Sequence, residues 1–272
     1  MIVLPDAWLE RWYEKDAFDQ VFQLKGEVFR EHVGRKTIRF SIDGTYYFAK
    51  LHFGIGWREF VKNLFQLRFP VTSAENEWNA IRKLDRIGIH TMHLVGYGKR
   101  GWNPARLQSF VITEELENTV SLEDFCRDWP ASRPDGRVKK KLIAEVARIA
   151  RSIHLHGMNH RDFYLCHFLL ELSGKKRPVD PENIVLYLID LHRVQIRRST
   201  PMRWRVKDIA GLYFSSMDAG LSKRDFLRFV RLYERKALKE IFRENPAFWG
   251  RVSKRGVALY RKIFHKAPTL PW

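Results

Sequence analysis

Residues 156 to 170 read HGMNHRDFYLCHFLL and are the most informative part of this 272-residue chain. Apolar residues at helical spacing predict a long helix over residues 139–156, and Gly157 is the residue type that ends a helix at the lowest cost. Two apolar runs follow, at residues 168–170 and 186–190, and the second ends in an aspartate. The sequence therefore predicts a helix, a polar loop and two short strands, with a carboxylate directly after the second strand.

The polar loop contains His160, Arg161 and Asp162 in succession, and His167 lies five residues beyond the aspartate. Such a triplet is common by chance, but the elements around it have the order found around the catalytic loop of protein kinases, where asparagine occupies the position of His167. In that arrangement Asp162 accepts the proton of the attacking hydroxyl and Asp190 binds Mg²⁺. His160 and Arg161 are expected to organise the loop.

The composition is that of a folded protein, because 45% of the residues are apolar and 14% are aromatic, which excludes a disordered or collagen-like chain. The length allows one large domain or two small ones. The two cysteines, Cys126 and Cys166, are too few for a disulfide framework and indicate a reducing compartment. No run approaches the roughly 20 apolar residues of a membrane span, and the first residues lack a basic leader, so we expect a cytoplasmic protein.

The net charge of +18 favours an acidic partner, such as nucleic acid, an anionic membrane surface, a phosphorylated substrate or an acidic protein. No zinc-ligand spacing, RNP-like motif or basic heptad region is present, so no nucleic-acid partner is expected. Arginine and lysine are dense over residues 193–207, and this tract predicts a basic rim beside the active site.

The first half of the chain has the pattern of short helices followed by an antiparallel sheet. Residues 6–24 predict two helices, with Asp6 and Asp16 as caps. Alternating apolar residues then predict strands, and Asp43-Gly44 is a typical hairpin turn between two of them. The predicted strands are residues 28–30, 37–42, 46–51, 93–97 and 109–113.

Lys50 is the candidate for contacting the α- and β-phosphates of a nucleotide, because it follows Tyr-Phe-Ala in a strand as the kinase lysine follows Val-Ala-Ile. A lysine within an apolar strand needs an anionic partner. The helix predicted over residues 74–84, with Ser73 as its cap, offers Glu77 for this pair. Glu75 is the competing candidate, and either glutamate could simply be a solvated helix charge.

The turn predicted around residues 31–36 is where a nucleotide kinase places a glycine-rich loop, but only Gly34 occurs here. A phosphate could be held by backbone N–H groups together with Arg35 and Lys36, or the turn could be a solvated basic one. The basic and aromatic stretch at residues 54–70 covers the sheet in one interpretation and contacts a lipid-linked or acidic partner in the other.

A polar connector, Glu114, Glu115 and Leu116, follows the last predicted strand and corresponds to a kinase hinge, whose backbone bonds the adenine edge. After it the chain becomes mostly helical. We therefore predict an α+β, two-lobed protein-kinase-like fold. Its N-terminal lobe, residues 1–117, would hold the leading helices, the antiparallel sheet and one helix equivalent to the kinase αC helix, and residues 118–272 would form a helical lobe with the catalytic loop.

Several longer phrases resemble one particular family, the lipopolysaccharide core heptose(I) kinases of Gram-negative bacteria. The resemblance extends over residues 18 to 232 and is specific, since ordinary protein kinases do not share these phrases. The phrases are YFAKLHFGIGWREFVKNL, FPVTSAENEWNAI, SFVITEEL, HRDFYLCHFLL and KDIAGLYFSSMDAGLS.

The resemblance implies ATP- and Mg²⁺-dependent phosphorylation of a hydroxyl on the first heptose of the lipid A–inner core oligosaccharide. It also implies peripheral association with the cytoplasmic face of the anionic inner membrane, and binding to the acidic acyl carrier protein. By the same resemblance Lys50 binds phosphate, Asp162 is the catalytic base and Asp190 is the metal-binding aspartate, here in Asp-Leu-His. Asp208, which we expect to open a helix, would brace the catalytic loop.

Two departures from the protein-kinase pattern affect these roles. His167 replaces an asparagine that binds metal, and because imidazole is a poorer Mg²⁺ ligand than an oxygen, His167 either completes the metal site or binds phosphate instead. The missing glycine-rich loop and the missing Ala-Pro-Glu segment argue against peptide substrates. The alternatives to a sugar kinase are a Tyr or Ser/Thr protein kinase and a catalytically inactive kinase fold that serves as a basic binding module.

Overall fold

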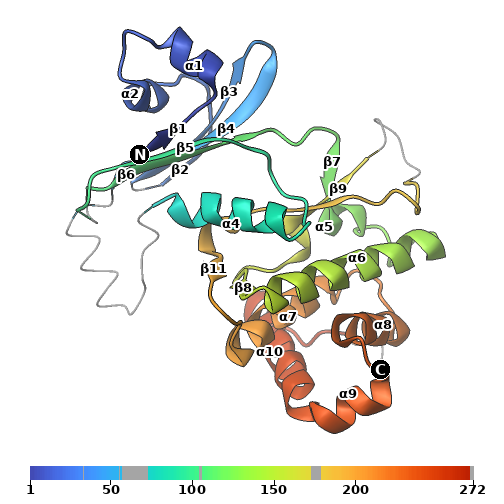
Figure 1. Ribbon diagram of the computed structural model, residues 1–272. Coiled ribbons are helices and arrows are strands. Elements are labelled where there is room, and N and C mark those ends of the chain that lie inside the picture. The colour runs from blue at the N-terminus through green and yellow to red at the C-terminus, as the bar shows by residue number, and fades with distance from the viewer. Residues whose placement is uncertain (33, 55, 57–72, 104–105, 173–178, 270–272) are drawn as a thin grey trace. The chain divides into compact units, whose positions relative to one another are not determined.

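The computed structural model describes residues 1–32, 34–54, 56, 73–103, 106–172 and 179–269 (Figure 1). The fold is α+β, as predicted, and the chain divides into two compact units. The first unit comprises Met1–Lys83, Met92–Leu116 and Leu191–Arg193, and the second comprises Leu84–Thr91, Glu117–Asp190 and Val194–Trp272. Most of residues 54–70, for which a covering or contact role was predicted, lie outside the described residues. Within the described part of the chain, no helix is long and apolar enough to cross a bilayer.

The first unit contains a six-stranded antiparallel sheet with the strand order β1-β5-β6-β4-β3-β2. The predicted hairpin between β3 and β4 is confirmed, because Asp43 and Gly44 have φ values of 52° and 84°, as a type I′ turn requires. The strands are β1 (Ile2–Val3), β2 (Glu27–His32), β3 (Arg35–Ile42), β4 (Thr45–His52), β5 (Leu94–Arg100) and β6 (Gln108–Glu114).

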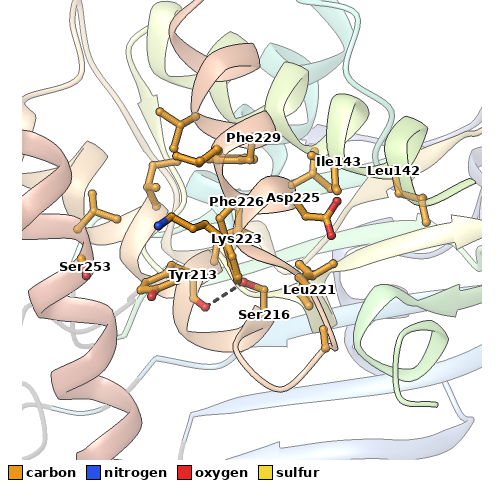
Figure 2. Close-up of a pocket in the computed structure, with 18 of the residues that line it drawn as sticks. Leu142, Ile143, Tyr213, Ser216, Leu221, Lys223, Asp225, Phe226, Phe229 and Ser253 are labelled. Carbon is orange, nitrogen blue, oxygen red and sulfur yellow. Dashed lines mark hydrogen bonds between the residues drawn. The ribbon is translucent and has the colours of Figure 1, made fainter. Parts of the chain in front are cut away.

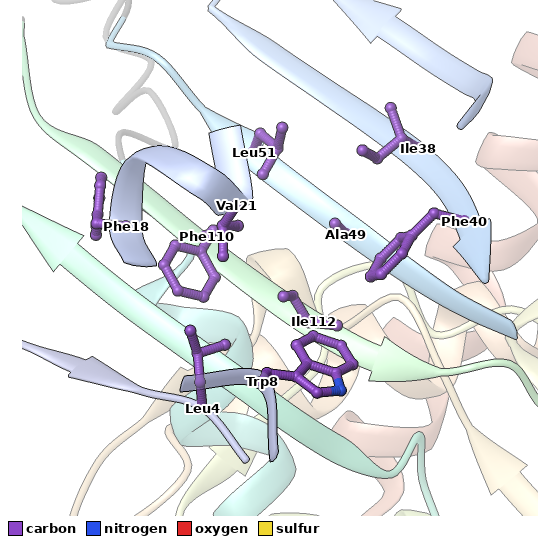
Figure 3. Close-up of a cluster of buried hydrophobic side chains, with 10 residues drawn as sticks. All are labelled: Leu4, Trp8, Phe18, Val21, Ile38, Phe40, Ala49, Leu51, Phe110 and Ile112. Atoms are coloured by element: carbon purple, nitrogen blue, oxygen red, sulfur yellow. The ribbon is translucent and has the colours of Figure 1, made fainter. Parts of the chain in front are cut away.

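Two short helices, α1 (Asp6–Arg11) and α2 (Ala17–Phe22), cover one face of this sheet. Their buried side chains meet those of the strands in a compact apolar cluster (Figure 3). Asp16 caps α2 as predicted, since its carboxylate accepts hydrogen bonds from the N–H groups of Phe18 and Asp19. The predicted cap at Asp6 is wrong, because Pro5 occupies that position and Asp6 lies in the first turn.

The opposite face of β4 carries Lys50, because side chains alternate along a strand and its neighbours Ala49 and Leu51 belong to the apolar cluster. On this side lies α4 (Glu75–Arg86), and its Glu77 is only 1% exposed. The Ser73 hydroxyl accepts a hydrogen bond from the N–H of Glu75 and so supports the start of this helix, as predicted.

The second unit is mainly helical. Its longest helix, α6, starts at Gly136, where the side chain of Asp135 caps it, and Gly157 follows its end with a φ of 76°. Short strands form a three-stranded sheet, β10-β9-β7, and a two-stranded one, β11-β8. The helices are α5 (Leu122–Phe125), α6 (Gly136–Leu155), α7 (Met202–Ser216), α8 (Lys223–Glu234), α9 (Leu238–Glu244) and α10 (Pro246–Phe264). The strands are β7 (Thr119–Ser121), β8 (Met158–Asn159), β9 (Phe168–Glu171), β10 (Leu186–Leu188) and β11 (Gln195–Ile196).

One helix boundary differs from the prediction. Asp208 does not open a helix but lies inside α7, which begins at Met202. Pro201 precedes it with a φ of −59°, and a proline suits this position because its missing N–H has no partner to lose at a helix start. Three basic residues of the tract, Arg203, Arg205 and Lys207, therefore belong to the first turns of α7, and their charge concealed the start of the helix in the sequence.

Candidate active site

The loop after β8 is held in place by a buried carboxylate. Asp208 is 0% exposed, and its two oxygens accept hydrogen bonds from the backbone N–H groups of His160 at 2.7 Å and Arg161 at 2.8 Å. The ring of His154 on α6 adds a third contact at 3.4 Å. Because charge-assisted hydrogen bonds are short and strong, this arrangement fixes the backbone immediately before Asp162.

Two residues of this region have backbone conformations that L side chains rarely adopt. Arg161 has a φ of 76° and Asp190 a φ of 60°. Neither is a glycine, so each conformation costs about 1–3 kcal/mol that the surrounding contacts must offset. Such conformations concentrate at functional sites. Here one belongs to Arg161, which directly precedes Asp162, and the other belongs to Asp190, the candidate metal ligand.

His160 is a neutral structural residue of the loop. It is 1% exposed, and burial lowers the pKa of its imidazole. Its Nε2–H donates to the carbonyl of Ile189 at 2.9 Å, while its Nδ1 is buried and has no partner among the described residues. The hydrogen bond connects the loop that contains Asp162 to the residue before Asp190.

His167 is oriented by the same loop. Its Nδ1–H donates to the carbonyl of Asp162 at 2.6 Å, so in the neutral ring Nε2 carries the lone pair. That Nε2 lies 3.4 Å from Oδ2 of Asp190, and the ring stacks on that of His160 with the centroids 5.8 Å apart. A histidine whose second nitrogen is bonded to a carbonyl is the usual form of a metal-ligating imidazole.

The donor set formed by Asp190 and His167 suits Mg²⁺ only in part. Mg²⁺ prefers oxygen ligands, which Asp190 offers, and binds imidazole poorly. It commonly takes only one or two carboxylates from a protein and the remaining ligands from nucleotide phosphates and water. In the described residues, no group of three or more His, Cys, Asp and Glu side chains is arranged to hold a metal ion. Asp190 therefore fits a nucleotide-dependent Mg²⁺ site, with His167 beside it.

The candidate phosphate-binding residues lie in the first unit. Lys50 and Glu77 form the predicted ion pair, through Nζ and Oε1. The competitor Glu75 instead pairs with Lys99 at 2.6 Å, on the same helix but from a more exposed position. Because Glu77 is buried and the Lys50 side chain is about one quarter exposed, the pair holds an ammonium group at a defined place on the sheet.

The predicted turn at residues 31–36 is shorter than expected. The strands β2 and β3 pair as far as His32 and Arg35, so Arg35 and Lys36 both lie on β3, and Gly34 has a φ of 73° in the connection. His52, opposite Arg35 in the ladder, is a residue that the sequence reasoning missed. Burial, with help from the nearby cations Arg35 and Lys50, lowers the pKa of His52 to about 3, so its ring is neutral near pH 7.

The predicted hinge residues are partly engaged in the sheet. The N–H of Glu114 donates to the carbonyl of His93 at 3.0 Å, and the N–H of Glu115 donates to that of Tyr46 at 2.9 Å. The Glu115 carboxylate forms a bidentate pair with Arg39 at 2.8 to 3.1 Å. The N–H groups of Glu114 and Glu115 are thus not available to an adenine ring, and Leu116 completes this connector.

The second unit also contains an apolar cavity of about 310 Å³ that the sequence did not reveal (Figure 2). Leucine and isoleucine side chains from α6 and phenylalanine side chains from α8 surround it, and Lys223 and Asp225 at the start of α8 add charged groups. Asp225 is paired with Lys139 at 2.8 Å and with Arg228 at 2.9 Å. Amphipathic helix patterns predict which faces are buried but not whether packed faces leave a space between them.

Comparisons with known proteins give one consistent result. Residues 19–233 match the lipopolysaccharide kinase (Kdo/WaaP) family. Two relatives from Pseudomonas aeruginosa and Escherichia coli are both named lipopolysaccharide core heptose(I) kinase WaaP. The first is 46% identical over 96% of each chain, and the second is 44% identical over 98% of this chain and 100% of the relative. A solved structure titled "WaaP in complex with acyl carrier protein" is 43% identical, with a TM-score of 0.81 over 96% of this chain and 99% of that one.

Proposed function

This chain belongs to the lipopolysaccharide kinase (Kdo/WaaP) family, and we propose from that membership that it phosphorylates a hydroxyl of the first heptose in the lipopolysaccharide inner core. The observation that carries the proposal is the identity of 44–46% to two named heptose(I) kinases over nearly the whole length of both chains. The family and the kinase-like fold predicted from the sequence are therefore confirmed. ATP is the phosphoryl donor that we propose.

Asp162 is the catalytic base of this proposal. The heptose oxygen attacks the γ-phosphorus, the bond from that phosphorus to the β–γ bridging oxygen breaks, and ADP leaves. Asp162 accepts the proton that the attacking hydroxyl releases, an effect usually worth about 10²- to 10⁴-fold in rate. The fixed backbone before it supports this role, because Asp208 holds the N–H groups of His160 and Arg161 at 2.7 and 2.8 Å.

Asp190, with His167 beside it, is the proposed Mg²⁺ ligand. When bound, the ion would neutralise charge on the phosphate oxygens. The bond from Nδ1–H of His167 to the Asp162 carbonyl holds its Nε2 3.4 Å from Asp190, so the same loop orients the base and the neighbour of the metal ligand. In the other role considered for it, His167 would bind phosphate directly.

Lys50 is the proposed contact to the α- and β-phosphates, and Glu77 holds its ammonium group. Arg35 and Lys36 are further candidates for phosphate contact from β3. For adenine binding, the connector Glu114, Glu115 and Leu116 supplies the candidates. Each of these roles is tested by the ATP dependence of single variants, since loss of a nucleotide contact raises KM for ATP without altering KM for the saccharide.

The first experiment incubates the purified protein with [γ-³²P]ATP, Mg²⁺ and a heptose-containing lipid A core, with a peptide library in a parallel reaction. Transfer to the saccharide supports the proposed function. Transfer to peptides alone would support a protein kinase, and the absence of both transfer and ATP binding would support an inactive binding module.

The second experiment examines Asp162→Asn, which keeps the size of the side chain and removes its basicity. We expect turnover to fall by at least about 100-fold while ATP affinity and thermal stability stay close to those of the wild type. Glu123→Gln, an exposed substitution on α5, is the matched control and should leave turnover unchanged. Near-full turnover by Asp162→Asn would remove Asp162 as the base.

An acyl carrier protein is the proposed protein partner. The solved relative is titled as a complex with one, and an acidic carrier suits a chain with a net charge of +18. Carrier proteins of this class bear fatty acyl chains, and the apolar cavity of about 310 Å³ beside α8 would gain apolar contacts by receiving one. Lys223, which lines the same cavity, adds a positive charge there.

Thermal melting tests this partner directly. Acylated carrier protein should raise the melting temperature, and carrier protein without its acyl chain should raise it less, because only a ligand that binds the folded state stabilises it. Ile143→Trp, which fills the cavity, should reduce the difference, whereas Leu232→Trp on the exposed side of α8 should not. Equal increases in melting temperature with both carrier forms would show that the cavity does not bind the acyl chain.

Peripheral contact with the anionic inner membrane is proposed from charge alone. A chain of this net charge should sediment with vesicles that contain phosphatidylglycerol at low salt, and the bound fraction should fall as salt rises. Binding to neutral vesicles of equal strength would contradict an electrostatic contact.

A further inference from the structure

Four cationic side chains surround a single indole in the second unit. Trp204 lies in the first turn of α7, and cationic atoms of four residues lie between 5.3 and 5.8 Å from the centroid of its ring. They are Arg161 from the catalytic loop, Arg197 after β11, and Arg203 and Lys207 from α7. Like charges gathered around one ring repel one another, so what offsets the charge of each of them matters for the stability of the cluster.

Backbone contacts position Arg197 beside the catalytic loop. β11 pairs with β8, the strand that leads into the loop, and the N–H of Arg197 donates to the carbonyl of Gly157 at 2.8 Å. A Cβ at Gly157 would lie 1.9 Å from the Arg197 carbonyl oxygen, so the two backbones are in close contact. Thr200 extends the attachment, because its hydroxyl donates to the carbonyl of Met158 at 3.0 Å. The segment from Arg197 to Thr200 is thus attached to Gly157 and β8, directly before the loop that contains Asp162.

The charges of Arg197 and Arg203 are not offset by carboxylates. The Arg197 guanidinium donates to two neutral amide oxygens, Oδ1 of Asn159 at 2.6 Å and Oε1 of Gln195 at 2.7 Å. Arg203 is exposed, and its guanidinium carbon lies 5.3 Å from the centroid of the Trp204 ring. Within the residues that the structure describes, neither arginine forms an ion pair with an aspartate or glutamate.

The same cluster has more hydrogen-bond donors than acceptors. Nε1 of Trp204 and Nδ2 of Asn159 are buried donors without an acceptor in the described part of the chain. The bond that Oδ1 of Asn159 accepts from Arg197 fixes which end of the amide is the NH₂ group. Buried polar groups are rarely left without a hydrogen-bond partner, so these two donors, beside two guanidinium groups that form no ion pair with a carboxylate in the described residues, indicate a site that receives an oxyanion.

We propose that Arg197, Arg203 and Trp204 form a specificity site for an oxyanion on the acceptor saccharide, which places the reacting hydroxyl at Asp162. The proposal rests on the proposed function and extends it to the substrate. Guanidinium groups bind carboxylates and phosphates through paired N–H donors, and the indole N–H of Trp204 adds a further donor. The shared ligand chemistry is an oxyanion, and its two possible sources are the carboxylate of an acidic inner-core sugar and a phosphate of lipid A.

The test compares Arg203→Ala and Arg197→Gln with Arg255→Ala, which removes an exposed arginine of α10 and serves as the matched control. Steady-state kinetics with deacylated core saccharide should show KM for the saccharide raised about tenfold in each site variant, as loss of a charge-assisted hydrogen bond implies, with KM for ATP unchanged. Calorimetric binding of the saccharide should weaken by a similar factor. Arg203→Ala keeps the test valid if Arg197→Gln folds poorly, because Arg203 is exposed.

Modified acceptors identify the oxyanion. One of the two modified acceptors, the dephosphorylated or the carboxyl-amidated saccharide, should bind to the wild type about tenfold more weakly than the intact saccharide. The two site variants should bind that modified acceptor and the intact saccharide with equal affinity. The proposal is overturned if KM for the saccharide is unchanged in both variants, if KM for ATP rises equally, or if neither modification weakens binding. If the wild type phosphorylates no core saccharide, the proposed function is refuted instead. That result comes from the wild type alone and is therefore distinct from any result with the variants.

Discussion

Removing the Asp208 carboxylate should weaken the fold and the reaction together. The side chain is 0% exposed and accepts hydrogen bonds from the N–H groups of His160 and Arg161 at 2.7 and 2.8 Å. A hydrogen bond to a charged group contributes about 1.5–3 kcal/mol, and a buried donor left without a partner costs a similar amount. Asp208→Ala should therefore lower the free energy of unfolding by about 3–5 kcal/mol.

Asp208→Asn gives a graded version of the same change. The amide oxygen can still accept from one backbone N–H, but the NH₂ group then faces the other donor. We expect a loss of about 2 kcal/mol, between the wild type and Asp208→Ala. Turnover should fall in both variants because the backbone before Asp162 loses its fixed position.

Urea denaturation followed by tryptophan fluorescence measures the unfolding free energies, and the saccharide assay measures turnover. Asp85→Ala, which removes an exposed carboxylate from α4, is the control and should change stability by less than about 0.5 kcal/mol. If Asp208→Ala and Asp208→Asn both unfolded within that margin of the wild type, the hydrogen bonds to the loop would not have the importance assigned to them.

Three further outcomes follow from single contacts. Gly157→Ala should lower the stability strongly in thermal melting, because the added Cβ would lie 1.9 Å from the Arg197 carbonyl oxygen. Gly88→Ala is the control, because Gly88 also has a positive φ but an added Cβ there would have nothing within 4 Å, and it should lower the stability by only about 1 kcal/mol. Equal losses of stability in the two variants would refute the steric reason. Glu77→Gln removes the anionic partner of Lys50 and should lower kcat or raise KM for ATP by at least about tenfold. Unchanged kcat and KM for ATP would show that this ion pair has no role in nucleotide binding. His52 has a pKa of about 3 in the folded protein and a normal pKa when unfolded, so only the unfolded state takes up a proton as the pH falls from about 6.5 to 3. The free energy of unfolding should therefore be lower by about 2 kcal/mol at pH 5 than at neutral pH. An equally steep loss of stability with falling pH in His52→Gln would contradict this assignment.

Local sequence patterns predicted the main elements and the position of the candidate catalytic loop between them. Alternation along residues 46–51 and the Asp43-Gly44 turn specify a hairpin, because both depend on the backbone preferences of a few neighbouring residues. The long helix before Asp162 and the two short strands after it were predictable for the same reason, while the catalytic role of Asp162 stays a prediction. The Lys50–Glu77 pair was predictable too, since a lysine in an apolar strand restricts which helix residue can lie opposite.

Errors arose where a neighbouring feature in the chain concealed the local preference. The start of α7 was placed at Asp208, although Pro201 marks the true start, because the arginines between them suggested a solvated rim. The turn at residues 31–36 was expected to be open, yet β2 and β3 pair as far as His32 and Arg35. Ladder length depends on partners that lie in other strands, and a single strand does not encode it.

The chemical states of the site residues depended on contacts between residues far apart in the chain. Asp208 reaches N–H groups 47 and 48 residues earlier, and burial makes His160 and His52 neutral. Nε2 of His167 lies beside Asp190 because a backbone carbonyl holds its other ring nitrogen. Burial, tautomer and hydrogen-bond partner are properties of packed surfaces, which form only when distant segments meet. A sequence therefore names the candidate groups, and the folded structure decides their protonation, orientation and partners.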